Sequence, residues 1–137
     1  MMQARQKALS ILKAGVRAAD VDAEAREYLV QNGMKENLLH RTGHGVGLGN
    51  HEAPFLAQGS KEILQENMIV TVEPGIYIEG VGGYRHSDTI LITKDGYELL
   101  TTAPRELSDV IITKSNTLAR IKGNIIQRSL KMNEKES

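Results

Sequence analysis

The chain has 137 residues, of which 40% are hydrophobic and 25% are charged, so its composition is that of an ordinary globular domain. Basic and acidic residues number 17 each, which argues against a nucleic-acid partner or a membrane-binding basic patch. The absence of cysteine excludes disulfides, thiolate catalysis and Cys-ligated zinc. No apolar run approaches the roughly 20 residues that cross a bilayer, and no signal-peptide core is present, so we expect a cytoplasmic protein.

The first part of the chain has the pattern of two helices. Residues 2–14 are rich in strong helix formers, and their apolar side chains recur on one face. A second helix is predicted over residues 20–32, because apolar residues again recur at helical spacing. Asp20 or Asp22 is expected to cap its start, and Gly33 to end it.

The middle of the chain has the pattern of strands. Residues 68–72 form a β-branched run that 75–78 continues, and residues 89–93 form another. An Asp-Gly pair at 95–96 predicts a tight hairpin, with residues 98–101 as the returning strand. Helices followed by antiparallel strands indicate the α+β class. We therefore expect two helices on one face of a curved, mainly antiparallel sheet.

The end of the chain differs in character from the rest. Residues 114–137 are polar and basic, with a few apolar residues at roughly helical spacing. We predict one domain over residues 1–113 and a polar tail that is helical at first and then disordered. The alternative is a short helix that docks on a partner.

All four histidines fall in one stretch of the sequence: His40, His44, His51 and His86. Imidazole groups near carboxylates bind metals and transfer protons near neutral pH. The glycines that flank His44 allow the backbone to aim this side chain into a cavity, although a turn histidine bound to a carbonyl is an alternative. His40 and His51 could support the site or line the substrate, but either one taken alone fits a structural histidine better.

Glu73 ends an apolar strand and precedes a proline and a glycine. A carboxylate is costly to bury there unless a metal, an arginine or a proton donor receives it, and the alternative is a surface glutamate. Pro74 forces an extended backbone at Glu73 and so fixes its direction. Arg85 follows a flexible glycine-rich segment at 80–83, and it could lower the pKa of neighbouring carboxyls or hold a substrate carboxylate.

Four motifs follow one another along the chain: Gly-His-Gly-x-Gly, His-Glu-x-Pro, Thr-Val-Glu-Pro-Gly-x-Tyr and Gly-Gly-Tyr-Arg-His-Ser-Asp-Thr. Together they resemble the pita-bread metallopeptidase family, which includes aminopeptidase P, prolidase, methionine aminopeptidase and the metal-free creatinase. The resemblance covers about residues 9–110 and is closest to the proline-directed branch. It implies the carboxy-terminal half of a pita-bread fold and the hydrolysis of peptides with proline at the second position.

The resemblance also implies a site. In this family two aspartates, one histidine and two glutamates hold two divalent ions, here expected to be Mn²⁺, Co²⁺ or Zn²⁺. His44 matches the metal-binding histidine, and Glu73 matches the first glutamate. His40 and His51 match accessory histidines that place the substrate and transfer protons. Arg85 matches an arginine beside the second glutamate.

Two departures from the family pattern lower the expected activity. The two aspartates belong to the family's amino-terminal part, upstream of the matched region, and Ser87 stands where the second glutamate is expected. A neutral hydroxyl is a poor ligand for a divalent cation. We therefore expect a truncated chain that binds metal weakly or not at all and is inactive alone.

These departures leave several roles open. The exposed apolar surface of half a fold implies a homo-oligomer, or a partner chain that supplies the missing half. Ser87 also allows a metal-free, creatinase-like hydrolase of C–N bonds, with a histidine as acid and base and Glu73 binding a cationic substrate. A non-catalytic pseudoenzyme or binding module is the third possibility.

Overall fold

The computed structural model describes residues 1–111, which fall in two units, Met1–Ala103 and the part of Pro104–Ser137 up to residue 111. The first unit contains all the strands and the two long helices, and the second contains the short helix α3 (Leu107–Val110). Within the described residues, no helix is both long enough and apolar enough to cross a membrane. The predicted boundary at 113 and the predicted tail at 114–137 lie outside the described residues.

The first predicted helix is present as α1 (Met2–Ser10), and it is shorter than the expected span of 2–14. The backbone N–H of Ala14 donates to the carbonyl of Thr93 at 3.1 Å, and that of Gly15 donates to the carbonyl of Leu64 at 2.8 Å. Because these two N–H groups bond to distant segments, they are not available for helical hydrogen bonds. The helix therefore does not extend to residue 14.

The second predicted helix is present as α2 (Ala18–Gln31), followed by a 3₁₀ turn, η1 (Lys35–Asn37). The helix begins before Asp20, and Arg17 at its N-cap makes no side-chain cap, so the prediction that Asp20 or Asp22 caps the helix is wrong. Asp22 is buried and instead accepts bonds from Arg26 at 2.8 Å and 3.1 Å. At its other end the helix stops as predicted, because Gly33 has a φ of +77°.

Five strands form one antiparallel sheet in the order β2-β1-β3-β6-β7, and two more pair separately as β4-β5. Their bounds are β1 (Gly43–Gly45), β2 (Glu52–Leu56), β3 (Ile69–Val72), β4 (Gly75–Ile78), β5 (Gly82–Arg85), β6 (Asp88–Ile92) and β7 (Tyr97–Leu99). The hairpin between β6 and β7 closes at Gly96 as predicted, with the Thr93 N–H donating to the Gly96 carbonyl at 3.0 Å. The α+β class and the antiparallel sheet are confirmed.

The glycine-rich segment that the sequence marks as flexible, 80–83, forms the turn between β4 and β5 and then the first two residues of β5. Tyr77 on β4 lies opposite Gly83 on β5, and a Cβ atom at Gly83 would approach the Tyr77 ring to 2.7 Å. The absence of a side chain at Gly83 therefore lets the Tyr77 ring pack directly against the backbone of β5. Residues 75–78 do not continue β3, because Glu73 and Pro74 separate the two strands into different sheets.

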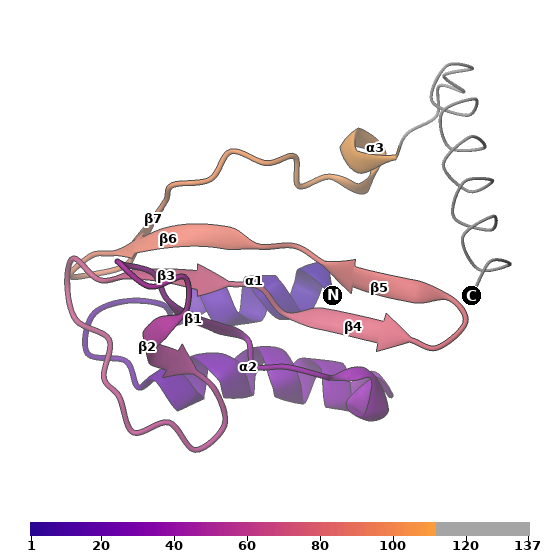
Figure 1. Cartoon of the computed structure of the whole chain (residues 1–137), viewed down its shortest axis with the longest axis horizontal. Helices are drawn as coiled ribbons and strands as arrows, with labels where there is room; N and C mark the ends of the chain where they lie inside the picture. The colour runs from indigo at the N-terminus through magenta and orange to yellow at the C-terminus, as the bar shows by residue number, and fades with distance from the viewer. Residues whose placement is uncertain (112–137) are drawn as a thin grey trace, which may run out of the picture. The chain divides into compact units, whose positions relative to one another are not determined.

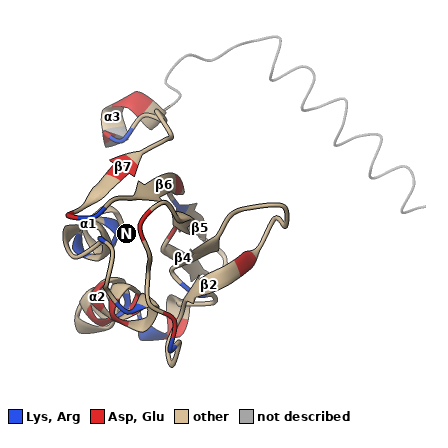
Figure 2. Cartoon of the chain, turned by 90° about the vertical axis from the view of Figure 1, so that its left-hand side faces the viewer, with Lys and Arg blue, Asp and Glu red and all other residues tan. Residues whose placement is uncertain are grey.

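The helices and the five-stranded sheet enclose the core of the first unit. Figures 1 and 2 show α1 and α2 together on one side of the sheet. Helix α1 contacts α2 and β3, and α2 contacts β2. The fully buried apolar side chains come from both layers and include Val21, Leu56, Val70, Ile90 and Ile92. Acidic and basic residues alternate along the ribbon of α2 (Figure 2).

Candidate active site

His44 is held at the centre of the short strand β1, between two close neighbouring strands. A Cβ atom at Gly43 would lie 1.9 Å from the Thr71 carbonyl oxygen, and one at Gly45 would lie 2.3 Å from that of Ala53. Only glycine permits such an approach, so the two glycines bring β2 and β3 against His44. The His44 backbone N–H donates to Thr71 Oγ1 at 3.1 Å, which fixes the residue to β3.

The His44 ring is oriented by a backbone carbonyl. Its Nδ1 lies 2.8 Å from the carbonyl oxygen of Gly45, which can only accept, so Nδ1 carries a hydrogen. Nε2 then faces Glu73 Oε1 at 3.3 Å, and both side chains are largely buried. In the neutral ring, Nε2 and the carboxylate are both acceptors, so this contact is favourable only with a proton or a cation between them.

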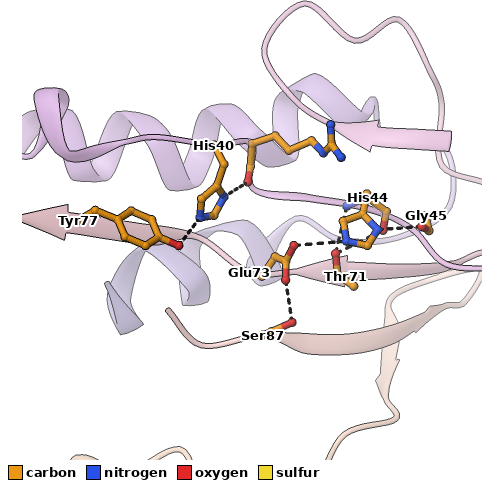
Figure 3. A network of polar contacts seen from close by, with 8 residues as sticks. His40, His44, Gly45, Thr71, Glu73, Tyr77 and Ser87 are labelled. Carbon is orange, nitrogen blue, oxygen red and sulfur yellow. Dashed lines mark hydrogen bonds and ion pairs between the residues drawn. The ribbon is translucent and has the colours of Figure 1, made fainter. Parts of the chain in front are cut away.

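Glu73 has a second partner on its other oxygen. The Ser87 hydroxyl donates to Glu73 Oε2 at 3.0 Å, while Oε1 faces His44. Figure 3 shows Glu73 between these two residues, at the start of the segment that links β3 to β4. The serine that replaces the expected second glutamate therefore holds the remaining carboxylate in a fixed orientation.

His40 is fully hydrogen-bonded at both ring nitrogens. Nδ1 donates to the carbonyl of Arg41 at 2.7 Å, and Nε2 accepts from the Tyr77 hydroxyl at 2.9 Å (Figure 3). The two rings meet edge to face, with centroids 5.4 Å apart. These two hydrogen bonds place the hydrogen of the ring on Nδ1 and fix the orientation of the His40 ring.

The predicted site residues line one cavity of about 550 Å³. The structure brings His40, His44, His51, Glu73 and Arg85 to its walls, beside Leu39, Arg41 and Ala57. The ring of His51 lies over that of His44, with centroids 4.1 Å apart. A further cavity, of about 670 Å³ between the end of α1 and the β6–β7 hairpin, has no histidine in its lining.

His86 is the histidine that does not join this cavity. Its Nε2 lies 3.5 Å from Asp88 Oδ2, and Asp88 also pairs with Arg5 of α1. Burial by itself raises the pKa of Asp88, but hydrogen bonds from Arg5 and Thr101 and the charges of Arg5 and His86 outweigh it, so the pKa lies below its ordinary value. His86 therefore faces a buried ion pair rather than the candidate site.

The described residues supply part of a ligand set for a divalent ion. His44 and Glu73 offer one imidazole nitrogen and one carboxylate oxygen, at a separation that suits two ligands of one ion. Among residues 1–111, no group of three or more His, Cys, Asp or Glu side chains is arranged to hold a metal. These two residues fit a metal site but do not complete one by themselves.

An imidazole that faces a carboxylate in an open cavity with further histidines and an arginine is a ligand arrangement used by metallohydrolases. The chain belongs to metallopeptidase family M24, whose sequence model matches residues 1–94. The fold, predicted as part of a pita-bread domain, is confirmed by solved members. The Xaa-Pro dipeptidase from Bacillus anthracis superimposes with a TM-score of 0.75 at 45% identity, over 77% of this chain and 30% of that one.

Other relatives show the same partial match. The Xaa-Pro dipeptidase of Pyrococcus horikoshii is 45% identical over 107 residues, which are 78% of this chain and 30% of that protein. The methionine aminopeptidase of Rickettsia prowazekii shares the fold with a TM-score of 0.60 at 24% identity, over 73% of this chain and 49% of that one. The chain thus spans about 30% of the length of the Xaa-Pro dipeptidases that it matches.

Four contacts in and around the site were not anticipated from the sequence. They are the bonds of Tyr77 to His40, Thr71 to His44 and Ser87 to Glu73, and the packing of the Arg41 guanidinium over Phe55 at 4.6 Å. A signal existed for Thr71, which lies two residues before Glu73 in an extended segment and so points to the same face. No local pattern signals the other three, and all four contacts join separate segments of the chain.

Proposed function

We propose that this chain forms part of the active site of an Xaa-Pro peptidase. Such an enzyme hydrolyses the peptide bond next to a proline at the second position of a peptide. The observation that carries the proposal is the contact of His44 Nε2 with Glu73 Oε1 at 3.3 Å inside the cavity. Relatives at 42% and 45% identity are named Xaa-Pro dipeptidases, which supports the same substrate class.

In this proposal His44 and Glu73 bind a divalent ion, Mn²⁺, Co²⁺ or Zn²⁺. Such an ion, when bound, polarises a scissile carbonyl and lowers the pKa of a water molecule. His51 lies over His44 and donates or accepts a proton at the substrate. His40, fixed by Tyr77, contacts the peptide from the cavity wall, and Arg85 orients a carboxylate.

The remaining metal ligands come, in this proposal, from outside the described residues. A second segment or a partner chain would supply them, through apolar contact with this unit, and a homo-oligomer is one form of that arrangement. By itself the chain then binds metal weakly and has little or no peptidase activity. The cytoplasmic location and the lack of nucleic-acid and membrane partners stay predictions from composition.

One observation favours a metal-free alternative. Ser87 donates to Glu73 at 3.0 Å, which occupies one oxygen of the carboxylate with a proton donor instead of a cation. A creatinase-like hydrolase of C–N bonds would use Glu73 to bind a cationic substrate and a histidine as acid and base. A non-catalytic binding module would need neither metal nor activity.

A chimera tests which of these functions holds. The 107 residues of the Pyrococcus horikoshii Xaa-Pro dipeptidase that match this chain are replaced by this chain's own residues, and hydrolysis of Leu-Pro is measured with added Mn²⁺. We expect low activity with Ser87, and a rise of about tenfold or more in Ser87→Glu, because a second carboxylate strengthens cation binding.

Matched variants separate the outcomes. Ser87→Ala removes the hydroxyl without adding a carboxylate and should stay at the low level, and His44→Ala and Glu73→Ala should abolish the activity. Activity that survives chelation and does not rise in Ser87→Glu would favour the metal-free hydrolase. A folded chimera that is inactive with either residue at position 87 would support the binding module and contradict the peptidase proposal.

A further inference from the structure

The carboxylate of Glu52 is turned back into the loop that connects β1 to β2. The Gly49 N–H donates to Glu52 Oε2 at 2.8 Å. Gly47 lies so close that a Cβ atom added to it would be 2.1 Å from Glu52 Oε1 and 2.6 Å from the carboxyl carbon. The side chain of Glu52 therefore occupies the inside of this loop, residues 46–51, and the glycines leave room for it.

At the start of the loop the Val46 N–H donates to the Ile69 carbonyl at 2.9 Å, but residues 47–51 have little else to hold them. Residues 47–51 are exposed, Leu48 at the tip fully so. The N–H of Gly47 meets the carbonyl of Gly49 only at 3.5 Å, which is a weak backbone bond. Glycine has more backbone freedom than other residues, so ordering a glycine-rich segment costs more conformational entropy. A charged acceptor on a backbone N–H is stronger than a neutral one, so Glu52 makes the firmest bond within this loop.

The loop ends at His51, the residue directly before Glu52. The His51 ring is tilted by 44° over the buried ring of His44, with centroids 4.1 Å apart, although His51 itself is exposed. The position of His51 over the cavity therefore depends on how residues 46–51 are folded. Glu52 is not in the lining of the cavity, so it reaches the site only through this loop.

We propose that Glu52 is a positioning residue for His51: its carboxylate keeps the loop folded so that the His51 ring stays over His44. The inference rests on the proposed function, in which His51 acts on the substrate. It assigns to Glu52 the role of limiting the orientations of a histidine that would otherwise move with an exposed, glycine-rich segment.

The test uses the 137-residue chain and nuclear magnetic resonance. In the unmodified chain we expect nuclear Overhauser contacts between the ring protons of His44 and His51, and slowed exchange of the Gly49 amide. Glu52→Ala should remove the ring contacts and accelerate Gly49 exchange by about tenfold, because the charged acceptor is lost. Glu52→Gln keeps an acceptor oxygen of the same reach and should restore most of both signals.

A second variant reproduces the effect without changing the charge. Gly47→Ala places a methyl group where the carboxylate lies and should displace it, so the ring contacts should weaken although Glu52 is still present. Gly96→Ala is the matched glycine control, because its nearest neighbour would be 3.9 Å away. Glu24→Ala, at an exposed position on α2, is the matched charge control.

Ring contacts that persist in both Glu52→Ala and Gly47→Ala would overturn the inference, as would loss of the contacts in Glu24→Ala to the same extent. These readouts involve no metal and no peptide. A failure of the positioning role is therefore distinguishable from a failure of the peptidase proposal, which the chimera decides separately.

Discussion

Replacing Gly43 with alanine is expected to destabilise the folded chain by about 3 kcal/mol and to separate His44 from Glu73. The new methyl group would lie 1.9 Å from the Thr71 carbonyl oxygen and 3.0 Å from Leu56 Cδ1. Backbone atoms of a central strand cannot yield to a contact of this kind without moving β1. Urea denaturation measures the loss of stability, and the His44 ring signals report the change at the site.

Gly96→Ala is the control for this prediction, because a methyl group there meets no atom closer than 3.9 Å. It should change the free energy of unfolding far less than Gly43→Ala. Equal stability of Gly43→Ala and the unmodified chain would show that β1 does not approach β3 as closely as described.

The second large effect is expected at the ion pair between Arg5 on α1 and Asp88 on β6. The side chain of Asp88 is 0% exposed and that of Arg5 is 5% exposed. Arg5→Met removes the charge but keeps an apolar side chain, and it leaves the Asp88 carboxylate buried without its main cation. Breaking a buried pair in this way costs about 3–5 kcal/mol. Urea unfolding at neutral pH measures this loss.

The acid side of the stability profile should change as well. The pKa of folded Asp88 lies below its ordinary value, so its ionised form adds stability above the pKa of the unfolded state, about pH 4. That contribution is lost as the pH falls through the folded pKa. Arg5→Met should therefore make stability less dependent on pH below about pH 4. The exposed Arg17–Asp20 pair is the control, and Arg17→Met should have little effect.

The sequence was sufficient for the features that depend on local pattern. The two helices, the strand before Glu73 and the Asp-Gly hairpin follow from periodicity and turn chemistry. The motifs around His44 and Glu73 also selected two residues that the fold brings to 3.3 Å. Their roles as metal ligands stay a proposal.

The features that were missed depend on contacts between distant segments. Strands β1 and β5 are rich in glycine, which indicates a loop in a single sequence, yet here the glycines admit the Thr71 carbonyl and the Tyr77 ring. His86 was grouped with the other histidines because it is near them in sequence. It turns instead toward Asp88, whose pairing with Arg5 joins positions separated by 83 residues.

The most direct test of the central claim is a titration of the unmodified chain with Co²⁺, followed through the ring signals of His44. Two ligands should give saturable but weak binding at millimolar metal, with the largest changes at His44. Glu73→Gln and His44→Ala should each remove it. Tight binding of two ions by the unmodified chain, or binding that neither substitution affects, would contradict the assignment of His44 and Glu73 as the metal ligands of this chain.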